Sequence, residues 1–160
     1  MRIKTEALYE TYKQNVYAAA FSVCRNSADA EDVLQDTFLR YHSANKQFQN
    51  EQHIRAWLLR VAINLATDLV RRRRRRGEEP LDDYLETLAF PSQETGDLFA
   101  AVMALPETYR AVIHLFYYED YTVEEIASLL KLTKSNVKVR LSRGRLLLKE
   151  SLKEAWNDDE

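Results

Sequence analysis

Glycine and proline are scarce in this sequence, which contains 3 of each among 160 residues. Both residues interrupt helices, whereas residues that favour helices dominate the chain. With 46% hydrophobic residues, the chain is long enough for one ordinary domain or two small ones. We therefore expect an all-α protein.

Cysteine and long apolar runs are also nearly absent. The single cysteine, Cys24, cannot form an internal disulfide, which fits a reducing compartment. No apolar run approaches the roughly 20 residues of a membrane span. Residues 1–13 lack the apolar core of a signal peptide. We expect a soluble, cytoplasmic protein.

Sequence patterns of common catalytic and metal sites are missing as well. The chain has no Glu-x-x-His pair, no Gly-rich phosphate loop and no G-x-S-x-G. The three histidines, His42, His53 and His114, have no zinc-ligand spacing with one another or with Cys24. We therefore predict that the chain alone is not an enzyme, and that it uses no metal, cofactor or small-molecule substrate.

Charge divides the chain into three parts. Residues 1–76 carry 14 basic and 8 acidic residues, residues 77–97 carry 7 acids and no base, and residues 98–160 carry 9 bases and 10 acids. The acidic part also contains two of the three glycines and two of the three prolines. This pattern predicts a domain at 1–76, a flexible acidic linker at 77–97 and a second domain at 98–160.

Apolar spacing predicts three or more helices on each side of that linker. The first three lie at about 4–24, at 27–43 with Ser27 as N-cap, and from about His53 through the arginines. The later helices lie at about 97–103, within 104–120, after a capping box at Thr122 to Glu125, and from Lys134 onward. Within the linker, "PLDDYLETL" could form a short helical turn.

The last two helices, joined by a very short turn, form a helix-turn-helix pattern. The turn carries Lys131 where such turns often have a glycine. On the second helix Val137, Leu141 and Leu148 share a face that must pack. Basic and polar residues that suit DNA phosphates and base edges lie elsewhere on it, namely Lys134, Ser135, Asn136, Lys138, Arg140 and Arg143. The alternative is that this basic face is only solvated and does not bind DNA.

The second predicted helix has an acidic face with one leucine in it. Asp32, Gln35 and Asp36 surround Leu39, while the apolar residues of the helix share the other face. An acidic face is usually only solvated, but an apolar centre with a polar rim is typical of protein interfaces. The pattern favours a protein partner.

The third predicted helix combines basic, amide and aromatic groups on one side. Its inner stripe is predicted to contain Ile54, Leu58, Val61, Ala62, Leu65, Ala66 and Leu69. The opposite side gathers Trp57, Arg60, Asn64, Thr67, Asp68 and Arg71, a set that suits nucleic acid. Trp57 could instead be half-buried in the core.

These segments, in this order, resemble the extracytoplasmic-function (ECF) sigma factors of the sigma-70 family of bacterial RNA polymerase. "DAEDVLQDTFLRYHS" resembles the family's core-polymerase-binding segment, and "IRAWLLRVAINLATDLVRRRRRR" resembles its minus-ten segment. Residues 105–152 resemble its minus-thirty-five domain. The resemblance implies two small helical domains, sigma regions 2 and 4, joined by a flexible linker, and a function in promoter-specific transcription initiation.

The resemblance also implies partners and residue roles. Core RNA polymerase would contact Asp32, Gln35, Asp36 and Leu39. Asn64 and Asp68 match exposed positions that face minus-ten DNA, and "HSANKQFQNEQ" would hold an unpaired promoter base. The helical pattern adds Trp57, Arg60 and Arg71 to the minus-ten contacts that we predict. Minus-thirty-five DNA would contact the basic and polar residues of the last helix. An anti-sigma factor is expected from the family only.

The arginine run, residues 71–76, is followed at once by the acidic linker. Successive helical residues turn by about 100°, so all six cannot face one row of phosphates. Some would reach DNA, and others would be solvated or would pair with the acidic run. A repressor or activator that never touches polymerase, and a small helical adaptor, are the rival functions.

Overall fold

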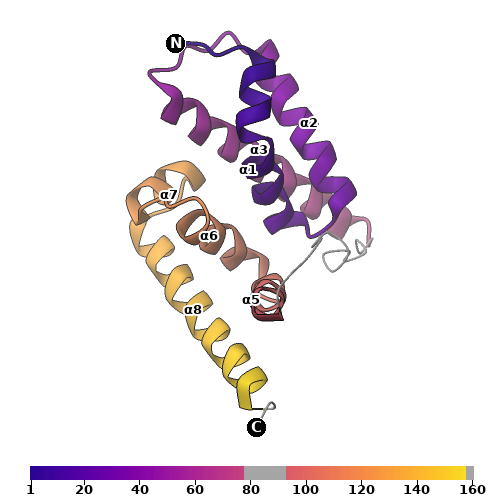
Figure 1. Cartoon of the computed structure of the whole chain (residues 1–160), viewed down its shortest axis with the longest axis vertical. Helices are drawn as coiled ribbons and strands as arrows, with labels where there is room; N and C mark the ends of the chain where they lie inside the picture. The colour runs from indigo at the N-terminus through magenta and orange to yellow at the C-terminus, as the bar shows by residue number, and fades with distance from the viewer. Residues whose placement is uncertain (78–92, 158–160) are drawn as a thin grey trace. The chain divides into compact units, whose positions relative to one another are not determined.

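The computed structural model describes residues 1–77 and 93–157, and every regular element in these ranges is an α-helix. The chain divides into two compact units, Met1–Asp82 and Asp83–Glu160 (Figure 1). The fold is therefore all-α, as the scarcity of glycine and proline predicts. Most of the predicted linker, with its possible turn in "PLDDYLETL", lies outside the described residues, so the linker boundaries stay a prediction.

The first unit is a bundle of three helices, α1 (Thr5–Cys24), α2 (Ser27–Ser43) and α3 (Glu51–Arg75), each of which packs against the other two. Its core is formed by apolar side chains that recur at helical spacing. Those buried most completely include Leu8, Val16, Phe38, Tyr41, Ile54, Leu58 and Leu59. The acidic helix therefore buries its apolar face, as predicted.

The N-cap of α2 is Asn26, and the prediction of Ser27 was wrong. Asn26 is extended, and its side-chain oxygen accepts a hydrogen bond from the Asp29 N–H at 3.0 Å. This is the N-cap geometry that satisfies an otherwise unpaired helix donor. Ser27 already belongs to the helix. Two neighbouring residues of good capping type cannot be separated by sequence alone.

The buried face of α3 is wider and rotated relative to the predicted stripe. Leu59, Ile63 and Val70 are buried, whereas Val61, Leu65 and Leu69 are only half-buried. The physical reason is that α3 packs against both α1 and α2. A helix held between two neighbours buries a broader arc than one stripe.

The second unit contains α5 (Gln93–Met103), α6 (Glu107–Tyr117), α7 (Val123–Leu130) and α8 (Lys134–Asn157). α8 packs against α5, α6 and α7, and Val137 and Leu141 are buried in that contact while Leu148 is half-buried. At Gly144 an added Cβ would lie 3.2 Å from Ile113, so α6 and α8 approach closely there.

A turn of only residues 131–133 joins α7 to α8, as the helix-turn-helix pattern predicts. The predicted capping box is present, because the Thr122 hydroxyl accepts from the Glu125 N–H and the Glu125 carboxylate accepts from the Thr122 N–H. α7 ends where Lys131 takes a left-handed conformation with φ of 56°. The position has the backbone that favours glycine even though its residue is lysine.

Candidate polymerase and promoter interface

The α2 patch consists of Asp32, Gln35, Asp36 and Leu39 on the side of α2 opposite the core. Leu39 is 65% exposed, more than any other large apolar side chain among the described residues. Asp36 makes a long contact of 3.5 Å with Arg40, one turn away. Such an exposed pair contributes little to stability. The patch is therefore a polar surface with an apolar centre that the fold itself does not need.

The outer surface of α3 presents Asn64, Asp68 and Arg71 to solvent, with Arg60 half-buried. Trp57 is half-buried, and its ring centroid lies 5.8 Å from that of Phe48 and 6.1 Å from that of Tyr41. The packing therefore confirms the alternative in which Trp57 is half-buried in the core. One side of its ring braces the loop that precedes α3.

That loop, residues 44–50, is held partly by its own side chains and partly by the N-terminus, whose ammonium donates to the Phe48 carbonyl at 2.8 Å. Phe48 is buried, and Asn50 caps α3 by accepting from the His53 N–H at 2.9 Å. The Gln49 N–H donates to His53 Nδ1 at 3.2 Å. The remaining polar side chains of the loop are exposed: Asn45, Lys46, Gln47 and Gln49. The loop therefore has an anchored backbone and a polar outer surface.

Arg73, within the arginine run, is tied to its own unit by an ion pair. Its Nη2 donates to the Asp29 carboxylate at 2.6 Å, and Asp29 is buried near the start of α2. The two residues lie 44 positions apart. No local pattern could have revealed the pair. Arg71, Arg72, Arg74, Arg75 and Arg76 are exposed.

Cys24 lies beside this ion pair and is buried. Burial, with a smaller contribution from the charge of Asp29, raises the pKa of its thiol to about 11, although a hydrogen bond to Asn26 and the charge of Arg73 oppose the shift. A thiol with such a pKa is almost entirely protonated at neutral pH. It acts as a small apolar core residue.

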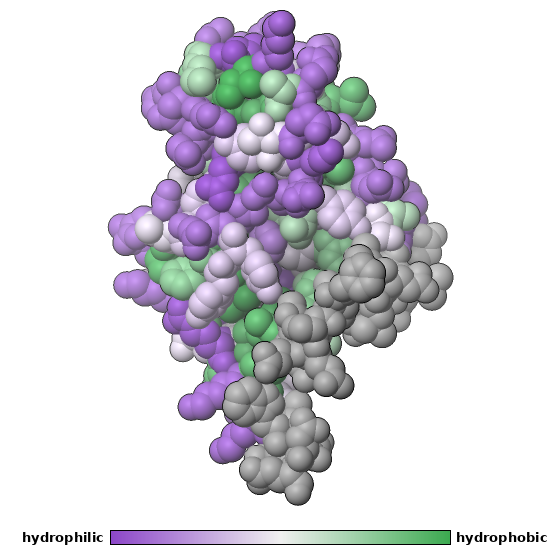
Figure 2. Space-filling view, viewed as in Figure 1, coloured by the Kyte–Doolittle hydropathy of each residue, from purple (hydrophilic) through white to green (hydrophobic). Residues whose placement is uncertain are grey.

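The exposed surface of α8 contains Lys134, Ser135, Lys138 and Arg143. Asn136 and Arg140 are half-buried and joined, since Arg140 Nε donates to Asn136 Oδ1 at 3.0 Å. Arg140 Nη1 also donates to the Thr108 carbonyl at 3.3 Å. The two lie four residues apart on one helix, the spacing at which side chains meet, so the sequence already carried a signal for this bond between two predicted DNA contacts. Figure 2 shows hydrophilic residues over most of one face of the protein, interrupted by smaller hydrophobic areas.

Two features are absent from residues 1–77 and 93–157. No helix there is long and apolar enough to cross a membrane. The same ranges bring no three His, Cys, Asp or Glu side chains together in an arrangement that could hold a metal ion.

Comparison with known proteins assigns both units. The family description of sigma-70 region 2 matches residues 8–76, and that of sigma-70 region 4 matches residues 96–148. RNA polymerase sigma factor SigV of Bacillus subtilis is 31% identical, over 92% of this chain and 93% of that protein. ECF RNA polymerase sigma factor SigW of the same organism is 27% identical, over 92% and 88%.

The fold is similar to a solved one. The sigma factor RpoE of Bartonella quintana, crystallised with the anti-sigma factor NepR, matches with a TM-score of 0.75 and 24% identity, over 92% of this chain and 96% of that one. Because both sigma-70 regions occur here in order, and the sigma-factor relatives match 92% of the chain, the chain belongs to the ECF sigma factors, which direct promoter-specific transcription initiation by bacterial RNA polymerase.

Proposed function

We propose that each of the three exposed surfaces has its own partner. The α2 patch binds core RNA polymerase, the outer surface of α3 with the loop 44–50 binds the minus-ten element, and the exposed surface of α8 binds the minus-thirty-five element. The corresponding domains are residues 1–76 and 98–160, with the acidic segment 77–97 as the linker. The chain supplies no catalytic group, and the polymerase makes the RNA.

The observation that carries the proposal is the exposure of Leu39 within the acidic surface of α2. An apolar centre of this kind loses contact with water only when a partner covers it. Asp32, Gln35 and Asp36 supply the polar rim, and the negative charge of the two aspartates selects a basic partner surface.

The ion pair of Arg73 with Asp29 sets the direction in which the other arginines point. Taking about 100° per residue, Arg71 and Arg75 lie on the side of α3 opposite Arg73. Asn64 and Asp68 lie on that same side. We infer that Arg71 and Arg75 extend the minus-ten surface along the phosphate backbone, whereas Arg73 fastens α3 to α2. Phosphate contacts of this kind position the protein, and the amide of Asn64 is suited to reading a base.

The predicted DNA-binding residues of α8 form two groups that differ in their contacts. Lys134, Ser135, Lys138 and Arg143 are exposed and can reach phosphates or base edges. Arg140 is oriented by Asn136 and by the Thr108 carbonyl, so it would meet DNA through its remaining N–H groups. A guanidinium that is already oriented loses less entropy on binding.

We place the protein in the cytoplasm, where its polymerase works. We also infer an anti-sigma factor as a partner, in keeping with the family and with the anti-sigma factor NepR in the crystals of RpoE.

The test compares the chain alone with the chain bound to core polymerase. A labelled duplex with both promoter elements should bind weakly to the chain alone and tightly to the reconstituted holoenzyme. Tight, sequence-specific binding of duplex DNA by the isolated chain, with no binding to core polymerase, would support the rival repressor function and contradict this one.

A further inference from the structure

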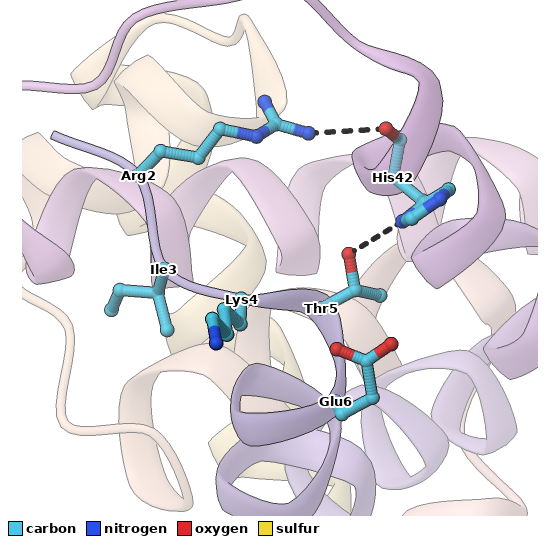
Figure 3. Close-up of a pocket in the computed structure, with 6 residues that line it drawn as sticks. All are labelled: Arg2, Ile3, Lys4, Thr5, Glu6 and His42. Carbon is cyan, nitrogen blue, oxygen red and sulfur yellow. Dashed lines mark hydrogen bonds between the residues drawn. The ribbon is translucent and has the colours of Figure 1, made fainter.

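The N-terminal segment, residues 1–5, binds the C-terminal end of α2, and this contact is called the clasp below. Arg2 Nη1 donates to the Ala44 carbonyl at 2.6 Å, and Arg2 Nη2 donates to the carbonyls of Tyr41 and His42 at 2.7 and 3.1 Å. The last carbonyls of a helix lack donors within the helix, and a cation there also meets the negative end of the helix dipole. Thr5 adds a contact to His42 Nδ1 at 2.9 Å (Figure 3).

Tyr41 connects the clasp to the loop that follows α2. Its hydroxyl accepts from the Ile3 N–H at 3.0 Å and donates to the Ile3 carbonyl at 2.7 Å. The Arg2 guanidinium lies 4.7 Å from the centre of its ring. On its other side, the ring packs against Phe48 at 5.8 Å and Trp57 at 6.1 Å. One buried side chain therefore touches the N-terminal segment, the loop and α3.

The clasp adds a side-chain anchor at the near end of the loop, where the Ala44 N–H also donates to the Tyr41 carbonyl at 3.2 Å. The far end is fixed by the Asn50 cap and the middle by buried Phe48. At the near end, the Ala44 carbonyl bonds to Arg2. Between these anchors the amides of Asn45, Gln47 and Gln49 are exposed. Amides read the edges of bases, but only when the backbone holds them in place.

We propose that Arg2 is a positioning residue for the capture of an unpaired promoter base by the loop 44–50. It does not touch the base. It holds the turn between α2 and the loop, so that the exposed amides keep the geometry needed to bind the base, since misplacement by about 1 Å is enough to weaken such sites strongly. This inference rests on the proposed minus-ten function of the loop.

The test uses reconstituted holoenzyme and forked promoter DNA in which each unpaired minus-ten base in turn is present or replaced by an abasic site. At the captured position, the wild-type protein should bind the base-containing fork about 10-fold more tightly than the abasic fork. Binding one unpaired base raises affinity by roughly that factor. Arg2→Gln should reduce this ratio to less than about 3-fold, with affinity for the abasic fork nearly unchanged. Tyr41→Phe, which keeps the ring but removes the bonds to Ile3, should reduce it in the same direction.

Lys4→Gln is the matched control, because it removes the same charge from an exposed residue of the same segment and should keep the wild-type ratio. Equal loss on base-containing and abasic forks would overturn the inference and leave Arg2 with a general structural role. A fall of about 0.7 in the salt slope of binding would also overturn it, because Arg2 would then contact phosphate directly. If the wild-type protein shows no discrimination at any position, the proposed function of the loop fails instead.

Discussion

At the scale of single residues, Leu39 gives the sharpest test of the polymerase interface. Leu39→Arg should weaken binding to core polymerase by about 1–3 kcal/mol, as expected for a central interface residue. The fold should survive because the side chain is exposed. Gln14→Arg adds the same charge to an exposed position of α1 and should bind normally. Titration of labelled protein with core polymerase measures both, and equal affinities would remove the α2 patch from the interface.

Lys131 gives a prediction about stability. A residue with a Cβ is strained in the left-handed conformation by about 1–2 kcal/mol. Glycine avoids this strain, but it loses more conformational entropy on folding, which offsets part of the gain. Lys131→Gly should therefore stabilise the second unit by about 0.5–1 kcal/mol. Lys131→Ala keeps the Cβ and should give no such gain. Urea unfolding followed by circular dichroism compares the two variants, and a larger gain for alanine would contradict the explanation.

Cys24 gives a prediction about pH and reactivity. Its pKa of about 11 in the folded protein exceeds the unfolded value of 9.0, because burial disfavours the thiolate. The contribution of this thiol to the free energy of unfolding is therefore fully present below pH 9, and it is lost as pH rises from 9 toward 11. We expect a thiol reagent at pH 8 to label Cys24 only as fast as the protein opens. Rapid labelling of the folded protein, compared with a urea-unfolded sample, would show that the thiol is accessible.

At the scale of elements, the ion pair of Arg73 with Asp29 separates a structural arginine from those proposed to contact DNA. Arg73→Gln leaves a buried carboxylate without its partner and should destabilise the first unit by about 2 kcal/mol, with little change in the salt slope of promoter binding. Arg75→Gln should do the reverse, lowering the slope by about 0.7–0.9 while stability stays the same. Thermal unfolding and binding at several salt concentrations give both quantities. A lower slope for Arg73→Gln would place that residue on the DNA.

Local patterns predicted most of the helices and the capping box, because these depend on neighbours a few residues apart. They failed where contacts with other helices, or with residues far away in the sequence, decide which side chains are buried or paired. The buried face of α3 is rotated because two helices pack on it, so Val61 and Leu69 are less buried than expected. The pairing of Arg73 with Asp29 and the clasp of Arg2 on α2 join residues about 40 positions apart. Periodicity has no information about such contacts. The functional assignments of individual site residues stay predictions.

At the scale of the whole molecule, the arginine run should contribute only part of its charge to DNA binding. Replacing residues 71–76 by glutamine keeps length and helix propensity. With Arg73 bonded to Asp29 and the others spread around the helix, the salt slope of holoenzyme binding should fall by the equivalent of two or three contacts, about 0.7–0.9 each. Binding to core polymerase without promoter should change much less. A fall equivalent to six contacts would contradict this geometry.

The central claim is that this chain gives core polymerase its choice of promoter through two DNA elements. The most direct measurement is transcription in vitro by core polymerase from a randomised promoter library, with and without the chain, followed by sequencing of the transcripts. We predict that the chain enriches templates sharing a minus-ten and a minus-thirty-five motif, and that Arg143→Ala relaxes the preference only at the upstream motif. Transcripts with no shared motif, or the same transcripts from core polymerase alone, would contradict the account.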